Sequence, residues 1–583
     1  MKFYFRNIKR FKKPCAKGSE KQLPLKIACI LDEFSHECFK HECILIPLKK
    51  TNWQKTLTNE KPHMLLVESA WMGNDGSWRY QISNLQDKSD KPLEQLIRWC
   101  RFYKIPTVFW NKEDPLNFQR FISAAKLFDY VFTTDSHCIP KYMEILGHNR
   151  IYSLPFAAQP KIHNPINKNK TKLGEVAFAG TWYNTGHEER VKQLEMMLKP
   201  ALNYDLHIYD RMNNFTQSDH YKFPHVYQPH IKGSLAYDEM TSTYKKYPIF
   251  LNVNSCNQSP TMFSRRVFEL LACGTNVISS YSVGIDEMFS GIVHLSQSEA
   301  ETISHLELLI NDQGKRDQYS LIGIREVLKH HTYKHRLNQI VKKVMNTSID
   351  KEEPLVSIVM GTNRQYYMDN VFSNFDMQNY KNKEMIVVLN DNRMDLKLWK
   401  NRAKKYKNVM ILQLDEAEPL GACLNLAISK ANGDIITKFD DDNYYAPEYL
   451  GDLLNAFKYT DADIVGKGCY YIYFEGLKTL GLKFEYKENQ YTKFVAGSTI
   501  TGKKHVFDKV KFVTDRQQGS DSQFLQDCSK QGFKIYSTDR FNHVVCRRAS
   551  LDDHTWKIND EEHLKKCKII TENTDDYTTP VTV

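Results

Sequence analysis

Three consecutive aspartates, Asp440–Asp442, follow directly on the apolar, β-prone segment Ile435–Phe439, and this junction narrows the choice of folds more than any other feature. Adjacent carboxylates at the end of a strand repel one another, so they persist where a divalent cation compensates their charge. Hard oxygen ligands suit Mg²⁺ or Mn²⁺, which keep several waters and bridge to a substrate diphosphate. The alternative is a solvated acidic turn, because acidic triplets are common on protein surfaces. The order of the surrounding elements decides between these two interpretations.

Length and composition predict a globular protein with several domains. The chain has 583 residues, of which 41% are hydrophobic and 26% charged, which suggests about three to four compact units. No apolar run approaches the ~20 residues of a membrane span. The thirteen cysteines are scattered without CxxC pairs, as in a cytoplasmic protein with reduced thiols. The net charge of +11 is spread along the chain without a nucleic-acid-binding module, so small anionic partners such as nucleotide sugars or lipid phosphates are favoured over nucleic acid.

The first 24 residues form a basic tail in which phenylalanines alternate with lysines and arginines. The tail has no long hydrophobic stretch, so it is not a secretory signal. It could settle on an anionic membrane surface, and a disordered basic tail is the alternative. We therefore expect a cytoplasmic protein, with peripheral attachment to the inner face of the membrane as an option.

Strand-like runs alternate with helical stretches along almost the whole chain, which predicts parallel sheets built from βαβ units. The pattern gives two Rossmann-like lobes, residues 25–165 and 166–346, each with four short apolar strands. A polar segment that ends at a proline, residues 347–353, then acts as a linker. The third unit covers residues 354–560. The acidic, threonine-rich residues 561–583 are expected to form a flexible tail.

In the third unit, polar clusters follow three successive predicted strands. The first cluster contains Thr362 and Arg364, the second contains Asp391, and the third is Asp440–Asp442. Ligands bind beyond the carboxyl ends of parallel strands, so we expect these clusters to hold the base, ribose and diphosphate of one nucleotide. Taken alone, Thr362 would be a helix cap and Asp391 part of a turn. The occurrence of all three clusters in this order favours a single ligand site.

The sequence of residues 354–560 resembles the glycosyltransferase family 2 domains, which have the GT-A fold. The motifs that carry the resemblance are Val356–Val359, Val387–Asp391, Leu420–Asn425, Ala431–Asp434, Asp440–Tyr444, Ala496–Thr499 and Gly519–Phe524. The resemblance implies that Asp440 and Asp442 bracket a metal ion and the donor diphosphate, and that Asp521 is the general base for the acceptor hydroxyl. It also implies a single displacement that inverts the anomeric carbon, with Mn²⁺ or Mg²⁺ stabilising the departing diphosphate.

Two positions of this unit leave alternatives open. His554 would be a further metal or phosphate contact, and a packed or surface histidine is the alternative. Asn390 stands where the family usually has a paired acid, so Asp391 carries the base-binding role less securely than in the family.

The strongest chemical signal in the two lobes is the segment Arg265–Ile278. On the predicted helix, Glu269 could accept hydrogen bonds from both ribose hydroxyls of a nucleotide, and Arg266 could meet the diphosphate as a bidentate donor. A surface glutamate on an amphipathic helix is the alternative.

This segment resembles the ribose-binding helix of GT-B glycosyltransferases, and residues 60–290 resemble the CgeB-like (spore-maturation) group. The pieces that carry this resemblance are Trp110–Pro115, Phe132–Asp135, Phe178–Tyr183 with Arg190, and Arg266–Glu269. Gly180 would let the backbone approach a phosphate and Arg190 would neutralise it, with a turn glycine and a surface arginine as the alternatives. Candidates for a catalytic base here are Asp114, Asp135 and His137, and none is convincing.

The sequence thus predicts an α/β protein with a GT-B-like pair of Rossmann lobes followed by a GT-A domain. The expected function is a two-module glycosyltransferase that uses nucleotide-sugar donors, UDP-sugars above all. The acceptor would be a glycan or a lipid-linked acceptor of a bacterial surface or spore coat. The alternative is that only the GT-A domain is catalytic and that the lobes bind glycan or serve as a scaffold.

Overall fold

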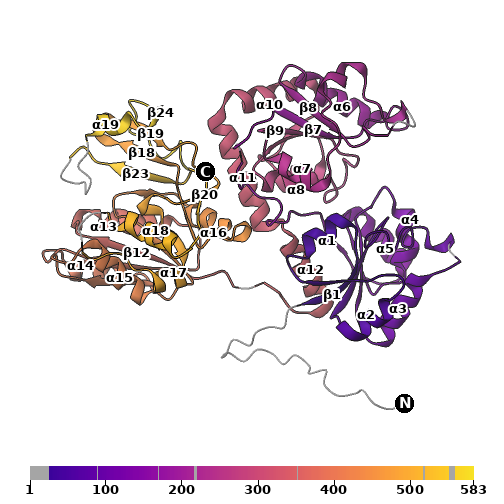
Figure 1. Ribbon diagram of the computed structural model, residues 1–583, viewed down its shortest axis with the longest axis horizontal. Coiled ribbons are helices and arrows are strands. Elements are labelled where there is room, and N and C mark those ends of the chain that lie inside the picture. Colours follow the sequence, from indigo (N-terminus) through magenta and orange to yellow (C-terminus); the bar gives the residue numbers. More distant parts are fainter. Residues whose placement is uncertain are drawn as a thin grey trace, which may run out of the picture.

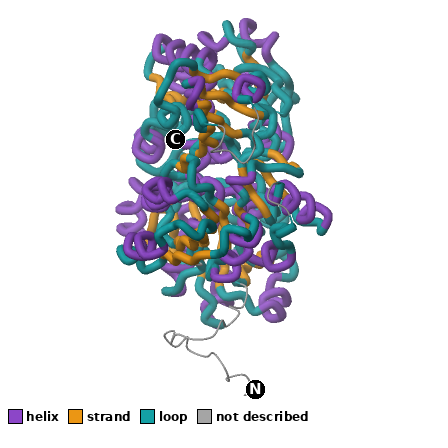
Figure 2. The backbone as a smooth tube through the Cα atoms, turned by 90° about the vertical axis from the view of Figure 1, so that its left-hand side faces the viewer, coloured by secondary structure: helices purple, strands orange, loops and turns teal. Residues whose placement is uncertain are grey.

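The structure is a computed structural model that describes residues 25–87, 89–168, 170–215, 219–350, 352–515, 519–550 and 559–583. Figure 1 shows three compact bodies, with the two N-terminal lobes (indigo and magenta) on one side and the third body (orange to yellow) on the other. In Figure 2 the strands form interior layers that helices surround. The predicted α/β class is confirmed. The basic tail and His554 lie outside the described residues.

The first lobe is a six-stranded parallel sheet in the order β2-β1-β3-β4-β5-β6. Its strands are β1 (Lys26–Ile30), β2 (Ile44–Pro47), β3 (Met64–Glu68), β4 (Thr107–Asn111), β5 (Tyr130–Thr133) and β6 (Ile151–Ser153), and its helices are α1 (Glu33–Phe39), α2 (Trp53–Glu60), α3 (Pro92–Phe102), α4 (Phe118–Ala125) and α5 (Ile139–Leu146). The predicted strands correspond to β1, β3, β4 and β5, whose residues are nearly all buried. The edge strands β2 and β6 were missed because they are short and half-exposed, so they lack a continuous apolar run.

The second lobe is a five-stranded parallel sheet in the order β11-β10-β9-β7-β8. Its strands are β7 (Val176–Gly180), β8 (Leu206–Asp210), β9 (Ile249–Asn252), β10 (Asn276–Ser280) and β11 (His294–Ser296), and its helices are α6 (Glu188–Ala201), α7 (Tyr237–Tyr244), α8 (Arg266–Ala272), α9 (Val283–Phe289), α10 (Glu299–Asn311) and α11 (Gln313–His330). The next helix, α12 (Tyr333–Met345), returns to the first lobe, where Tyr333 packs edge-on against Phe39 at 4.9 Å. Arg336 of α12 also donates to the carbonyl of Pro155 at 2.8 Å. The chain therefore crosses between the lobes twice.

The third body combines a mixed eight-stranded sheet, β14-β13-β12-β15-β21-β17-β22-β20, with a five-stranded sheet, β16-β23-β18-β19-β24. Its strands are β12 (Val356–Thr362), β13 (Lys383–Leu389), β14 (Val409–Gln413), β15 (Ile435–Lys438), β16 (Tyr444–Tyr445), β17 (Ile464–Gly466), β18 (Tyr470–Phe474), β19 (Thr479–Lys483), β20 (Gln490–Thr492), β21 (Thr501–Lys503), β22 (Ile535–Ser537), β23 (His543–Arg547) and β24 (Lys568–Thr571). Its helices are α13 (Met368–Met377), α14 (Leu396–Ala403), α15 (Leu420–Lys430), α16 (Tyr449–Tyr459), α17 (Lys504–Lys509), α18 (Ser520–Lys530) and α19 (Asp560–Leu564). Strands β12, β13 and β15 are parallel neighbours, so their carboxyl ends share one edge, as predicted.

Residues 561–583 do not form the flexible tail that their composition suggested. Strand β24 pairs with β19 in the second sheet, and Val581 is completely buried. The amide of Asn542 donates to the Val581 carbonyl at 2.9 Å. Backbone pairing and a few apolar anchors outweigh the polar composition of this segment.

Ion pairs join the second lobe to the third body. Arg325 of α11 donates two hydrogen bonds to Asp452 of α16, at 2.9 and 2.8 Å. Arg540 contacts both Asp317 of α11, at 2.7 Å, and Glu488 of its own body, at 2.8 Å. A cavity of about 910 Å³ lies between α11 and the third body.

Within the described ranges, no helix is both long and apolar enough to cross a bilayer.

Candidate functional site

The middle aspartate of the triplet is buried and held by the end of strand β12. Asp441 accepts a hydrogen bond from the hydroxyl of Thr362 and two from the guanidinium of Arg364. The Thr362 hydroxyl also accepts from the amide of Arg364, which fixes the turn after β12. The structure thus brings these three sequence-predicted positions together. Thr362 and Arg364 contact a carboxylate of the protein, so their base or phosphate roles stay predictions.

Arg364 also reaches the third aspartate. Its Nη2 atom lies 2.9 Å from Oδ2 of Asp442. Burial and the neighbouring Asp441 raise the pKa of Asp442 to about 6, and Arg364 opposes this shift. The guanidinium of Arg364 lies 4.7 Å from the ring centre of Tyr367, and that of Arg548 lies 5.4 Å from it. Tyr367 and Arg548 belong to no recognisable motif, so neither was predicted as a site residue.

A buried lysine links the first aspartate to the predicted base. The Lys438 ammonium lies 2.6 Å from Oδ1 of Asp440 and 3.1 Å from Oδ2 of Asp521. Burial raises the pKa of Asp521, whereas the charge of Lys438 lowers it. Oδ1 of Asp521 is buried and has no hydrogen-bond partner within the described ranges. Lys438 was not predicted as a site residue, although the sequence contains a signal for it. Lys438 is the one charged residue of the apolar segment that precedes the aspartates.

Two glycines set the position of Asp521. Gly519 has φ +78°, a left-handed conformation that glycine adopts without strain, and it directly precedes helix α18, which places Asp521 in the first turn. A Cβ atom on Gly497 would lie 2.1 Å from Oδ2 of Asp521. The close approach of the Gly497 backbone therefore packs the carboxylate against the protein.

Asp391 lies apart from this group of residues. Its carboxylate caps its own turn by accepting from the amide of Arg393 at 2.8 Å, and it pairs with the Arg393 guanidinium at 2.7 Å. These contacts lower the pKa of Asp391. The predicted contact of Asp391 with a base stays a prediction.

The donor set at the aspartates fits a hard cation that takes few protein ligands. In the part of the chain that the structure describes, no three His, Cys, Asp or Glu side chains form a metal cage. The carboxylates of Asp440 and Asp442 are both partly exposed. Mg²⁺ is commonly held by one or two carboxylates together with substrate phosphates and water. Asp440 and Asp442 meet that requirement, whereas the metal role of His554 falls outside the described residues.

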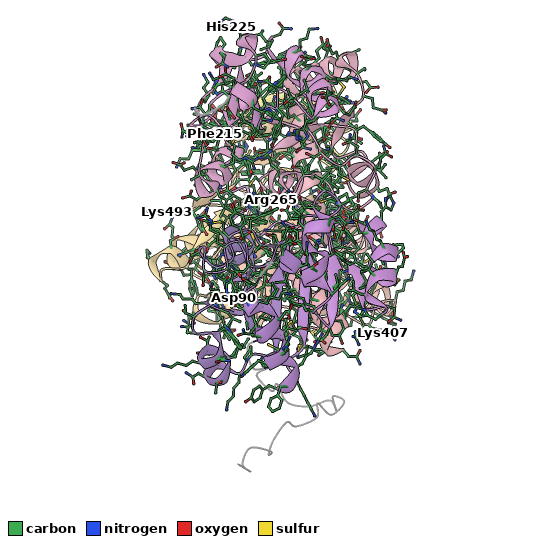
Figure 3. The ribbon with its side chains drawn as sticks, turned by 90° about the vertical axis from the view of Figure 1, so that its right-hand side faces the viewer. Asp90, Phe215, His225, Arg265, Lys407 and Lys493 are labelled. Atoms are coloured by element: carbon green, nitrogen blue, oxygen red, sulfur yellow. The ribbon has the colours of Figure 1, made fainter. Side chains whose placement is uncertain are left out.

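In the lobes, Glu269 is buried and already bonded by protein groups. Its carboxylate pairs with Arg265 and accepts from the hydroxyls of Tyr237, at 3.2 Å, and Tyr244, at 3.1 Å. His163 lies 3.8 Å away. The alternative of a surface glutamate on an amphipathic helix is wrong, because helix α8 is covered on both sides and all residues from Val267 to Ala272 are buried. Figure 3 labels Arg265, which lies where the two lobes meet.

Gly180, Arg190 and Arg266 lie at the carboxyl ends of the neighbouring strands β7 and β9. Arg266 donates to the carbonyl of Ala179 at 2.7 Å, next to Gly180. Arg190 donates weakly to the carbonyl of Val253 at 3.3 Å. The buried Nε atoms of Arg190 and Arg266 find no hydrogen-bond partner among the described residues. Burial and the charge of Arg266 lower the pKa of Arg190, while the charge of Arg266 also helps to lower the pKa of Glu269.

The candidates for a base in the lobes have structural contacts. Asp114 is buried and accepts from the hydroxyls of Thr133, at 2.6 Å, and Tyr142, at 2.9 Å; burial raises its pKa to about 7. Asp135 caps a short helix through the amide of His137 and accepts from Ser259 of the other lobe at 2.6 Å. Asp135 and Ser259 therefore join the lobes.

A charged cluster that the sequence analysis did not single out lies beside them. Lys112 lies 2.9 Å from the buried Glu68 and 3.6 Å from Asp32. The ring of Phe34 lies against two cations, Lys112 at 3.9 Å and Arg265 at 4.4 Å. The contact of Phe34 with Arg265 joins the first lobe to helix α8, which contains Glu269.

Two family models match the chain. Residues 358–516 match the model described as glycosyl transferase family 2, and residues 190–342 match the model described as glycosyl transferase-like. The chain carries a glycosyl transferase family 2 domain. A second glycosyl transferase-like domain precedes it, so the predicted order of the two modules is confirmed.

Solved structures resemble the chain only in part. Residues 1–349 of TarS from S. aureus match at 15% identity over 33% of this chain and 60% of that one, with a TM-score of 0.28. The same TarS fragment in complex with UDP-GlcNAc matches at 17% over 33% and 59%, with a TM-score of 0.28. The mannosyltransferase PcManGT from Pyrobaculum calidifontis, in complex with GDP-Man and Mn²⁺, matches at 17% over 36% and 63%, with a TM-score of 0.28. The chain thus spans less than two thirds of each of these structures, and no curated protein matches it.

Proposed function

We propose that the family 2 domain transfers a sugar from a nucleotide-sugar donor, with UDP-sugars first among the candidates, to a glycan or lipid-linked acceptor. The observation that carries this proposal is the contact of one ammonium group, that of Lys438, with both Asp440 and Asp521. A carboxylate suited to the donor side and a carboxylate suited to proton removal therefore lie within reach of a single side chain. We further propose that the reaction is inverting and depends on a divalent cation.

In this mechanism Asp521 takes the proton of the acceptor hydroxyl while its oxygen attacks the anomeric carbon from the face opposite the diphosphate. The new glycosidic bond forms as the bond to the diphosphate oxygen breaks, so the anomeric configuration inverts. Lys438 fixes the Asp521 carboxylate, and burial keeps that carboxylate basic. A bound Mg²⁺ or Mn²⁺ would stabilise the negative charge of the departing diphosphate. Asp440 and Asp442 would hold it, with Arg364 fixing Asp442.

Turnover of the full chain tests this function. The chain is incubated with Mn²⁺ and a panel of UDP- and GDP-sugars, and release of nucleoside diphosphate is measured with and without EDTA. We expect Asp521→Asn and Asp442→Asn each to lower turnover by at least about 100-fold. Asp527→Asn, on the same helix α18, is the matched control. Undiminished turnover in Asp521→Asn, or a product that keeps the donor's anomeric configuration, would refute the proposed mechanism.

For the lobes we propose a second nucleotide-sugar site at Arg190 and Arg266. Guanidinium groups with unpartnered, buried Nε atoms suit a diphosphate, which can accept several charge-assisted hydrogen bonds. The carboxylate of Glu269 already accepts hydrogen bonds from three protein side chains. This favours the alternative hypothesis, in which the lobes bind glycan or act as a scaffold without catalysis. A bacterial surface or spore-coat glycan is the product class we propose, and it rests on the resemblance of residues 60–290 to the CgeB-like group.

A further inference from the structure

The end of helix α3 exposes an unusual pair of aromatic side chains. Phe102 is 77% exposed and its neighbour Tyr103 is 55% exposed. Among the described residues, no other two consecutive large apolar side chains are each more than half exposed. The rings are held in place, because Tyr103 packs against Trp99 at 4.2 Å and against Phe102 at 5.0 Å. Contiguous exposed apolar groups, especially where polar residues rim them, are a feature of interaction sites.

Basic side chains surround these rings. Arg98 and Arg101 lie in the C-terminal part of α3 and Lys104 follows the helix, and Arg98 is 77% exposed. Glu94 pairs with Arg98 at 3.2 Å, and Asp129 lies 3.9 Å from Arg101. Lys104 has no such partner within the described ranges, and the exposed Lys126 adds a further positive charge beside the carbonyl of Leu127, which Arg101 contacts. The surface therefore keeps an excess of positive charge around a partly apolar centre.

The topology places this surface at a defined edge of the first lobe. Helix α3 runs antiparallel to the strands, and only a short loop joins its end to the start of β4 at Thr107. The end of α3 thus lies at the edge where the parallel strands begin, and β1 begins there too, at Lys26. The carboxyl ends of the strands, with Asp32 and Lys112, lie at the opposite edge. Figure 1 shows α3 at the outer corner of the lobe, away from the second lobe.

We propose that this α3 surface, formed by Arg98, Trp99, Arg101, Phe102, Tyr103 and Lys104, binds an anionic lipid bilayer. Aromatic rings favour the boundary between lipid headgroups and acyl chains. Nearby lysines and arginines are attracted to the negative charge of an anionic leaflet. The combination of rings and cations fits a lipid surface better than an apolar protein groove, which would leave the charges unpaired. The proposal is independent of the glycosyl transfer proposed above.

This orientation also has a consequence for access to the lobes. A membrane bound at the edge where the strands begin leaves the opposite edge, where the two lobes face each other, open to solvent.

Vesicle binding by the full chain tests the proposal. The chain is sedimented with vesicles of phosphatidylcholine alone and with vesicles that also contain roughly 30% phosphatidylglycerol, at low salt and at about 0.5 M salt. We expect binding to the anionic vesicles only, weakened by salt. The double variant Phe102→Ser, Tyr103→Ser should lower the partition coefficient by about tenfold or more, because it removes the apolar contact. Arg98→Glu with Lys104→Glu should lower binding to anionic vesicles by a similar factor.

The matched control is Tyr486→Ser, which alters a 71% exposed tyrosine of the third body. It should bind vesicles as the unaltered chain does, and thermal unfolding should show that all variants are folded. The proposal is overturned if the unaltered chain does not bind anionic vesicles, or if the Phe102→Ser, Tyr103→Ser variant binds as well as the unaltered chain. An equal loss in Tyr486→Ser would also overturn it, because binding would then not depend on the α3 surface.

Discussion

The Lys438 ammonium lies 3.1 Å from the Asp521 carboxylate, although the two residues belong to elements far apart in the sequence. The same ammonium contacts Asp440 at 2.6 Å. The buried ammonium of Lys438 therefore contacts both the first aspartate of the triplet and the proposed base. This arrangement couples the position of the base to the site where the donor diphosphate is expected to lie.

Replacing Lys438 should lower both the turnover rate and the free energy of unfolding. In Lys438→Met, Asp440 and Asp521 lose their shared cation, and breaking a buried ion pair on one side typically costs about 3–5 kcal/mol. We expect turnover to fall by about 100-fold, with Lys438→Arg retaining part of it because the charge is kept. Nucleoside diphosphate release and thermal unfolding measure the two effects. Lys430→Met on the exposed end of α15 is the control. If Lys438→Met turned over donor at the normal rate, Lys438 would not position Asp521.

Gly497→Ala should impair the base without removing any functional group. The new methyl group would lie 2.1 Å from Oδ2 of Asp521, so the carboxylate or the backbone must move. A displacement of about 1 Å at a reacting group can cost on the order of 100-fold in rate. Gly476→Ala is the control, because its Cβ would meet Ala549 only at 3.5 Å, an ordinary contact. Equal turnover in the two variants would show that the Gly497 contact does not matter.

Much of the fold could be predicted from the sequence because the central strands are continuous apolar runs. Strands β12, β13 and β15 each combine burial on both faces with a polar cluster at the carboxyl end. The edge strands β2 and β6 carry no such run. Residues 561–583 were misjudged because their order depends on pairing with β19 and on the buried Val581, which are long-range contacts.

Site residues could be predicted where a polar side chain directly follows or ends an apolar strand, as for Asp440 and Thr362. Contacts made across the fold could not be predicted. Periodicity gave no sign that Glu269 would be enclosed by Tyr237 and Tyr244, since both come from a different helix. The same limit applies to Lys438, whose charge is visible in the sequence but whose partner Asp521 is not.

Acid should destabilise the protein through buried and partly buried histidines that are neutral when folded. Burial lowers the pKa of six of them to about 3–4, namely His163, His294, His331, His335, His543 and His563. Between the ordinary value near 6.5 and these lowered values, the unfolded chain binds more protons than the folded one, so stability falls as pH falls through this window. His163 alone would cost up to about 3 kcal/mol at pH 4.

Proton uptake on unfolding, measured by calorimetry in two buffers at pH 5.5, checks this prediction. The buried His163 faces Glu269 at 3.8 Å, and the nearby Arg265 opposes its protonation. His163→Gln should lower the uptake by nearly one proton and flatten the fall in unfolding temperature between about pH 6.5 and 4. An unchanged uptake would mean that His163 is already charged in the folded protein.

Arg325→Ala should loosen the contact between the second lobe and the family 2 domain. Arg325 donates two hydrogen bonds to Asp452, whose side chain is almost completely buried. Asn542 also donates to Asp452, so part of the carboxylate stays satisfied. We expect a loss of about 3 kcal/mol and faster proteolysis between the modules. Lys329→Ala on the exposed end of α11 is the control. If both variants unfolded and were cleaved alike, the ion pair would not hold the modules together.

Arg266→Ala and Arg190→Ala should weaken nucleotide binding by the lobes. Each change removes a guanidinium whose buried Nε lacks a partner within the described ranges, and a hydrogen bond to a charged group contributes about 1.5–3 kcal/mol. Titration of UDP into the full chain in EDTA, where the metal-dependent site is weakened, should show affinity falling by about 10- to 100-fold in each variant. Lys192→Ala on the same helix as Arg190 should leave the affinity unchanged. If the arginine variants bound UDP as the unaltered chain does, or if the unaltered chain showed no binding in EDTA, the lobes would instead be a glycan-binding or scaffold module.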